Sequence, residues 1–159
     1  KGWKLMSTAT VDVDLYLDHV KVVVNEATME VLKALAFRIA GRAQVNIRTN
    51  NQIDTGFMVN SIYPIWSNGS NFREALEAAA AQTTSSKTGR SVDHSEDMSE
   101  EPTKPTKDAA GVVVGANYAI YQESIQPFLY PAAEAAAQEF GGEASKIYKE
   151  ELPNERSKK

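Results

Sequence analysis

The stretch from Val20 to Arg48 constrains the fold more than any other part of the chain, because it contains no proline and only one glycine. Apolar residues, with one threonine among them, recur through it at the 3.6-residue period of an α-helix. They fall on one side of that helix: Val24, Thr28, Val31, Leu32, Leu35, Ile39 and Ala43. The pattern predicts a long amphipathic helix whose apolar side packs against the rest of the protein.

A second row of apolar and small residues follows another side of the predicted helix: Ala34, Phe37, Gly41 and Val45. Two interpretations of this row are open. It either widens the face that packs on the core, or it contacts a neighbouring subunit.

The predicted helix is also rich in positive charge. No acidic residue occurs between Glu30 and Asp54, while four cations do: Lys33, Arg38, Arg42 and Arg48. Cations towards a helix C-terminus are favoured by the helix dipole, which is a sufficient explanation. A ring of such helices would also present a basic surface to DNA.

Three shorter stretches predict strands. Residues Thr10–Asp18 alternate between apolar and polar side chains, which is typical of a half-buried strand. Residues Ser61–Trp66 also predict a strand, with Pro64 expected at an edge or a bulge because it has no N–H to donate. Residues Gly111–Gly115 form a short apolar run between glycines, which favours a well-buried strand.

Two further stretches predict helices. The first follows Asn71, the expected N-cap, with Glu74 three residues later in a capping-box arrangement. The second has Pro131 in its first turn and alanines after it. Its apolar pattern continues in phase past Gly141 and Gly142, where we expect a weak point or a bend.

The order of these elements predicts an α+β fold: a small antiparallel sheet covered on one face by a long N-terminal helix and a C-terminal helix. We expect a single domain over residues 1–159, with an ordered core in residues 7–69 and 110–152. Residues 70–109 would be an insertion, made of the short helix and a mobile polar loop, and residues 153–159 a frayed tail.

The second part of that insertion, residues 83–109, is polar, mixed in charge and nearly free of large apolar side chains. Such a segment buries too little surface to offset the entropy of ordering it. We therefore expect a solvated loop that would order against a partner in an assembly. His94 lies among acidic residues there and is expected to be solvated and without a role.

Composition excludes several classes of site. The chain has no cysteine, which rules out disulfides and thiolate metal ligands and fits assembly in a reducing cytoplasm. With only two histidines, His19 and His94, a structural zinc site is not expected. A net charge of −4 argues against a protein that mainly grips phosphate backbones. No stretch is apolar enough to span a membrane, and we expect no metal and no cofactor.

The sequence Asp54-Thr55-Gly56 allows two interpretations. Aspartic proteases carry this motif, but they need two carboxylates that share a proton, so this chain would have to dimerise. They are almost entirely β, whereas Asp54 follows a long predicted helix, and Phe57 replaces the small residue that such sites favour. Alternatively, Asp54 and Thr55 accept backbone N–H groups a few residues on, and Gly56 permits the turn that leads to the next strand. The second interpretation is preferred, so no catalytic residue and no enzyme activity are expected.

Three segments in the right order behind the long helix carry a resemblance: "IDTGFMVNSI" from Ile53, "VVVGANYAIYQE" from Val112 and "QPFLYPAAEAA" from Gln126. Together they are similar to the minor tail-component family of long-tailed bacteriophages, which comprises head–tail joining or neck proteins. The matched positions are Asp54, Thr55, Gly56, Ser61, Ile62, Tyr118, Ala119, Tyr121, Glu123, Pro127, Phe128, Leu129 and Pro131.

The chain also departs from the family pattern. Gln52-Ile53 replaces the usual proline, and Met58 replaces a leucine. The loop after Glu123 is shortened and the one between Trp66 and Gly111 is enlarged, so contacts that relatives make through these loops are not carried over.

The resemblance implies a structural protein of the virion neck or tail end, assembled in the cytoplasm of the bacterial host. It implies a homo-oligomeric ring, a hexamer or dodecamer, with other neck, head-completion and tail-tube proteins as partners. DNA would pass through the ring without sequence-specific contacts. The row of Ala34, Phe37, Gly41 and Val45 is the candidate subunit interface, because rings need two different faces that meet. The alternatives are a tail terminator, a nucleic-acid-binding accessory protein that uses the helix cations, and a dimeric protease that uses Asp54.

Overall fold

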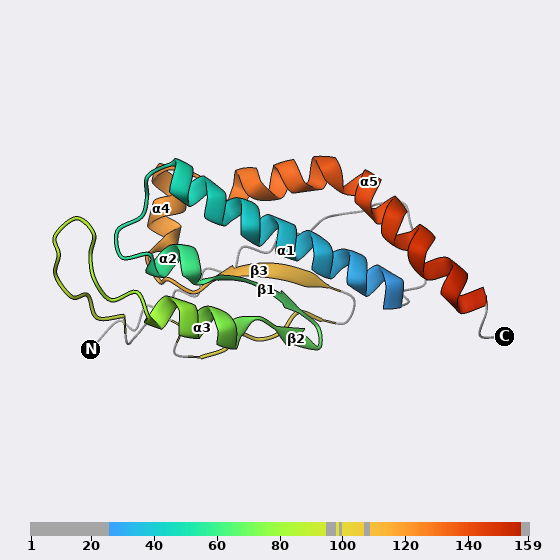
Figure 1. The fold of residues 1–159 in the computed structure, drawn as a ribbon, viewed down its shortest axis with the longest axis horizontal. Helices are drawn as coiled ribbons and strands as arrows, with labels where there is room; N and C mark the ends of the chain where they lie inside the picture. Colours follow the sequence, from blue (N-terminus) through green and yellow to red (C-terminus); the bar gives the residue numbers. More distant parts are fainter. Residues whose placement is uncertain (1–25, 95–97, 99, 107–108, 157–159) are drawn as a thin grey trace, which may run out of the picture.

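The computed structural model describes residues 26–94, 98, 100–106 and 109–156. Within them lie five helices and one three-stranded antiparallel sheet (Figure 1). The predicted α+β class is therefore confirmed. The strand predicted at Thr10–Asp18 lies outside the described residues.

Helix α1 spans Glu26–Thr49 and confirms the long helix predicted from the apolar pattern. Val31, Leu35, Ile39 and Ala43 of the predicted apolar side are buried. The helix ends where Asn51 adopts a left-handed conformation, with φ of 55°. The N–H of Gln52 then donates to the carbonyl of Ile47 at 3.0 Å, the long return bond of a Schellman C-cap.

The sheet is built around strand β1, Ile62–Trp66, which lies between β2, Gly69–Ser70, and β3, Ala110–Val114. Both pairings are antiparallel, with Tyr63 opposite Val113 and Ile65 opposite Ser70. These strands confirm the predictions for residues 61–66 and 111–115. All four residues from Ile62 to Ile65 are buried, so both faces of β1 are covered, because successive side chains point to opposite faces.

Pro64 lies in this central strand and not at an edge, so the prediction of an edge position was wrong. Its carbonyl accepts the N–H of Asn71 at 3.1 Å, on the side of β1 that faces β2. Strand β2 pairs only with Ile65 and Trp66. The ladder therefore stops beside Pro64, and the missing N–H removes no pairing within β2.

The layers are arranged in the order α5, α1 and sheet (Figure 1). Helix α1 packs on β1 and β3, and α5, Leu129–Arg156, packs along α1. Helices α2, Phe57–Asn60, and α3, Phe72–Ala80, contact each other and β1. One core cluster joins buried residues from α1, α2, β1, α3, β3, α5 and the short helix α4, Ala119–Ile125. No pattern in the sequence predicted α4.

Helix α3 confirms the short helix, but its predicted capping box is absent. The Asn71 side chain makes no capping hydrogen bond. The hydroxyl of Ser70 accepts the N–H of Phe72 at 3.3 Å instead. Asn71 is thus the N-cap as predicted, and its carbonyl accepts the N–H of Ala75 at 3.0 Å, but the side-chain bond to the first turn comes from Ser70.

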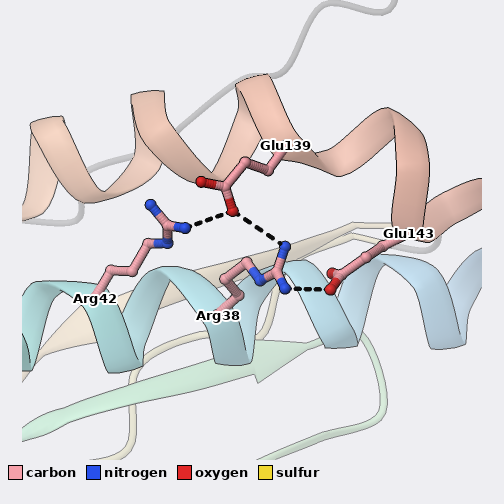
Figure 2. A network of polar contacts seen from close by, with 4 residues as sticks. All are labelled: Arg38, Arg42, Glu139 and Glu143. Atoms are coloured by element: carbon pink, nitrogen blue, oxygen red, sulfur yellow. Dashed lines mark hydrogen bonds and ion pairs between the residues drawn. The ribbon is translucent and has the colours of Figure 1, made fainter.

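Helix α5 continues through Gly141 and Gly142 as predicted, and it bends near Glu143 (Figure 2). The Ser145 hydroxyl donates to the Gly141 carbonyl at 2.9 Å, a back-bond that favours bending. The helix reaches Arg156, so residues 153–156, predicted as part of a frayed tail, are helical; residues 157–159 lie outside the described part. None of the described helices is both long enough and apolar enough to cross a bilayer.

Candidate functional site

The Asp54-Thr55-Gly56 segment forms the turn between α1 and α2. Gly56 is the N-cap of α2 with φ of 88°, a left-handed conformation that favours glycine. The Thr55 hydroxyl accepts the N–H of Phe57 at 3.1 Å. This local bond is the one expected for Thr55 in the structural interpretation of the motif.

Asp54 has a different partner from the one expected. Its carboxylate does not cap α2: Oδ1 accepts the Ser85 hydroxyl at 2.6 Å and the Lys87 N–H at 3.3 Å. Its backbone carbonyl accepts the N–H of Ser86 at 2.9 Å. The prediction that Asp54 holds amides two or three residues on was therefore wrong. Asp54 anchors the inserted segment to the end of the long helix.

These bonds change the acidity of Asp54. The hydrogen bond from the Ser85 hydroxyl, together with that from the Lys87 N–H, holds the pKa of Asp54 below its ordinary value, and these effects outweigh desolvation. The ionised carboxylate is thus the form that holds the inserted segment.

This predicts a pH-dependent contact. The pKa of Asp54 is lower in the folded chain than in the unfolded chain, so its ionised form stabilises the contact above about pH 4, the usual range for aspartate. The contact is lost as the pH falls through the lowered pKa. We expect the amide NMR signal of Lys87 to shift with a midpoint below 3.8, and Asp54→Asn to abolish that transition. A midpoint at or above 3.8 would contradict the anchoring role.

His94 was expected to be solvated and without a role, which was wrong. Its ring stacks on Phe57, with centroids 4.0 Å apart. Its Nε2 lies 3.3 Å from the Thr55 hydroxyl, and its ring lies beside that of Tyr118 at 6.5 Å. His94 therefore packs against Phe57, a contact that the acidic residues around His94 in the sequence did not indicate.

The inserted segment reaches the core at a second point. Met98 is buried, and a Cβ at Gly115 would lie 2.2 Å from its Cγ. Gly115, just after β3, is therefore the residue that makes room for Met98. The described part of residues 83–109 is tied to the core at Asp54, Phe57 and Gly115, while its mobility stays a prediction.

Ser61 is a polar residue with no exposed surface, placed between α2 and β1. Its hydroxyl donates to the Met58 carbonyl at 2.9 Å and accepts the N–H of Ala116 at 3.1 Å. Its own carbonyl accepts the N–H of Gly115 at 2.9 Å. Ser61 therefore joins the end of α2 to the segment that follows β3.

Glu123 joins α4 to α5. Its Oε2 accepts the N–H groups of Phe128 and Leu129 at 2.8 and 2.9 Å, and its Oε1 accepts that of Tyr130 at 2.9 Å. These are orphan donors at the start of α5, where a negative charge also interacts well with the helix dipole. The resemblance matched Glu123 without giving it a role; the structure makes it the cap of α5.

The segment that follows α4 is held against the end of α1. The side-chain amide of Asn46 donates to the Phe128 carbonyl at 2.8 Å, and that of Asn50 to the Pro127 carbonyl at 3.3 Å. Phe128 and Leu129 are buried. These bonds fix where α5 begins, so that it can lie along α1.

An open cleft of about 500 Å³ lies beside the Asp54-Thr55-Gly56 turn. Its lining includes Lys87, His94, Tyr118, and the side chains of Gln52, Gln122 and Gln126. Among the lining residues that the structure describes, Asp54 is the sole carboxylate, and it is already bonded to the inserted segment. Among the described residues no three His, Cys, Asp or Glu side chains are grouped so as to hold a metal ion. Within the described part of the chain, the cleft therefore shows no pair of carboxylates for acid–base catalysis.

Two cations of α1, Arg38 and Arg42, face two glutamates of α5, Glu139 and Glu143 (Figure 2). Arg38 is bonded to Glu143 and lies 3.5 Å from Glu139, and Arg42 contacts the same oxygen of Glu139. Lys33 pairs with Glu30 at 2.7 Å. Three of the four cations named in the sequence analysis are therefore paired with acidic residues of the same chain. This pairing weakens the nucleic-acid alternative.

The candidate interface row remains open to solvent along α1. Phe37 is 47% exposed although its ring lies 6.1 Å from that of Trp66, and Val45 is 56% exposed. Gly41 is exposed, and apart from its chain neighbours and the backbone of α1 itself no described atom lies within 4 Å of where its Cβ would be. Ala34 is partly exposed. Of the two interpretations of this row, the wider core face does not describe these positions.

Beside this row, a groove of about 550 Å³ runs between α1 and α5. Gly41 and Val45 line it from α1, and Pro131, Ala132 and Ala135 line it from α5. We call it the α1–α5 groove. The structure thus gathers most of the motif residues into three internal joints, at Asp54, Ser61 and Glu123, but leaves Tyr121 exposed and places Pro131 in the groove.

Comparison with known proteins adds no family to this description: no protein-family model, no curated protein and no solved structure matches the chain.

Proposed function

We propose that the chain is a structural subunit of a phage neck or tail end, which assembles into a ring through which DNA passes. The exposed row on α1 carries this proposal. Phe37 and Val45 stay about half exposed beside an unobstructed Gly41, although Phe37 also contacts Trp66, and a neighbouring subunit would bury all three.

The polar joints support the same proposal. Thr55, Ser61 and Glu123 all use their oxygens to hold backbone N–H groups where one element meets the next. Residues used in this way keep a small domain rigid, which is what a ring subunit needs. These structural roles also explain three residues of the matched motifs without requiring a catalytic role for Asp54.

The alternatives gain less from the geometry. The nucleic-acid alternative uses four cations of α1: Lys33, Arg38, Arg42 and Arg48. The first three are paired with Glu30, Glu143 and Glu139 respectively, and Arg48 is exposed. The protease reading requires Asp54 to release Ser85 and Lys87 and to meet a second copy of itself. A tail terminator would use the same exposed row and belongs to the same class of structural ring protein.

The test is Phe37→Asp. We expect the wild-type protein to form rings, visible by negative-stain microscopy and as a fast component in sedimentation velocity. The variant should stay monomeric, because an aspartate buried in an apolar interface has no partner for its charge. Its helical circular dichroism should match that of the wild type, since Phe37 lies outside the core cluster.

Ala78→Asp is the matched control, because Ala78 is exposed on α3, away from the row. It adds the same charge and should leave assembly intact. Rings formed by Phe37→Asp at the wild-type concentration would remove the support for this face.

A further inference from the structure

The exposed large hydrophobic side chains of the described residues fall into two groups on different elements. Phe37 and Val45 belong to the row on α1. The others lie on α4 and in the first turn of α5: Ile120, Tyr121, Ile125 and Tyr130. We call these four residues the α4 surface. Of these four, only Tyr121 was named from the sequence, as a motif position, and α4 was not predicted.

The α4 surface is large enough to matter for association. Tyr121, Ile125 and Tyr130 are 70%, 79% and 68% exposed, and Ile120 is nearly half exposed. Ile120 lies on a different side of α4 from Tyr121 and Ile125. At about 200 Å² for a large side chain, Tyr121, Ile125 and Tyr130 together expose on the order of 400 Å². A standard interface buries about 800 Å² on each partner, so these three side chains would supply about half of one side.

The electrostatics of the α4 surface also suit an interface. Glu123 is the one charged residue of α4, and its carboxylate is turned to the backbone N–H groups of α5. If a partner covered Tyr121 and Ile125, the one charge of α4, on Glu123, would therefore keep its hydrogen-bond partners.

The α1–α5 groove is a hollow with several small side chains in its lining. Its lining of Gly41, Ala132 and Ala135 consists of small side chains, which leave the hollow of about 550 Å³. The arginines at its rim, Arg38 and Arg42, are already paired with Glu139 and Glu143 (Figure 2). Apolar side chains can therefore bind in the groove without leaving a buried charge unpaired.

We propose that the α4 surface of one copy docks into the α1–α5 groove of the next copy. This inference rests on the proposed function, since a ring needs one face of a subunit to meet a different face of its neighbour. The α4 surface and the α1–α5 groove are formed by different residues, although both reach the first turn of α5, at Tyr130 and Pro131. Contact between two α4 surfaces would instead be symmetric and would close at a dimer.

Cross-linking between copies tests the proposal directly, because the chain contains no native cysteine. One preparation carries Ile125→Cys and the other carries Gly41→Cys, a position with open space for a side chain. The two are mixed and treated with a short thiol-reactive cross-linker. We expect about tenfold more cross-linked dimer from the mixture than from either variant alone, since docking raises the effective concentration of the two thiols.

The matched control replaces Ile125→Cys by Ala80→Cys, at an exposed position on α3. It should give only the background level with Gly41→Cys. The wild-type protein is followed in parallel by sedimentation velocity, so that assembly is measured without any cysteine.

The outcomes separate this inference from the proposed function. If the wild type assembles and the Ile125→Cys and Gly41→Cys mixture matches the control, the docking proposal is wrong and the ring stands. If Ile125→Cys alone cross-links as strongly as the mixture, the contact is symmetric and the docking proposal is also wrong. If the wild type stays monomeric and no pair cross-links, the ring itself is refuted.

Discussion

Glu123→Ala is expected to lower the free energy of unfolding by about 3 kcal/mol, because it removes a charged acceptor from three backbone N–H groups at the start of α5. Hydrogen bonds to a charged group are stronger than neutral ones, and the helix dipole adds to the loss. Phe128 and Leu129 are buried, so water reaches their region poorly and replaces the carboxylate only in part. Urea unfolding followed by circular dichroism measures the change.

Two further variants make this measurement specific. Glu123→Gln keeps an uncharged carbonyl oxygen, so its loss should be smaller than that of Glu123→Ala. Glu134→Ala removes an exposed carboxylate from the same helix and should cost about 0.5 kcal/mol or less. Equal losses for Glu123→Ala and Glu134→Ala would show that the cap contributes nothing.

Ser61→Ala is expected to lower the free energy of unfolding by about 2 kcal/mol, since it leaves the N–H of Ala116 without an acceptor in a fully buried place. The change in size is small, so the effect comes from the lost hydrogen bond and not from a cavity. Denaturant unfolding gives the loss of stability. Amide hydrogen exchange at Ala116 should become faster in the variant.

Ser124→Ala is a close control for this variant. The Ser124 hydroxyl also donates to the carbonyl three residues earlier, that of Tyr121, at 2.8 Å, but Ser124 is exposed. Water replaces its partner, so the expected loss is about 0.5 kcal/mol or less. If Ser61→Ala and Ser124→Ala lowered the free energy of unfolding equally, the buried hydrogen bond between Ser61 and Ala116 would stabilise the fold no more than an exposed one.

The regular elements were the predictable part of the fold. The apolar residues of α1 repeat at the helical period over many turns, and β3 contains three consecutive valines. In both cases the local sequence pattern favours the structure that the tertiary packing requires. Pro64 shows where this reasoning fails. Its position in the sheet depends on where β2 ends, at Ser70, and that is a property of two strands together and not of the sequence around Pro64.

The candidate site was less predictable, because its residues act across the chain. Asp54 was expected to bond locally, yet its partners are 31 and 33 residues away. Met98 and His94 lie in a polar segment without a period, so nothing in that segment marked them as contacts of the core. Glu123 is close in sequence to the N–H groups that it accepts, but its role depends on α4, which the sequence did not reveal.

Asp54 and Gly115 secure the inserted segment at Ser85–Lys87 and again at Met98, and this has a practical consequence for locating the protein in a particle. Gly89 lies between the two anchors, and apart from its two chain neighbours no described atom lies within 4 Å of where its Cβ would be. A peptide tag inserted there would be carried outside the packed layers on a short tether. Bound antibody or gold would then mark the position of each subunit by microscopy without disturbing α1 or the sheet.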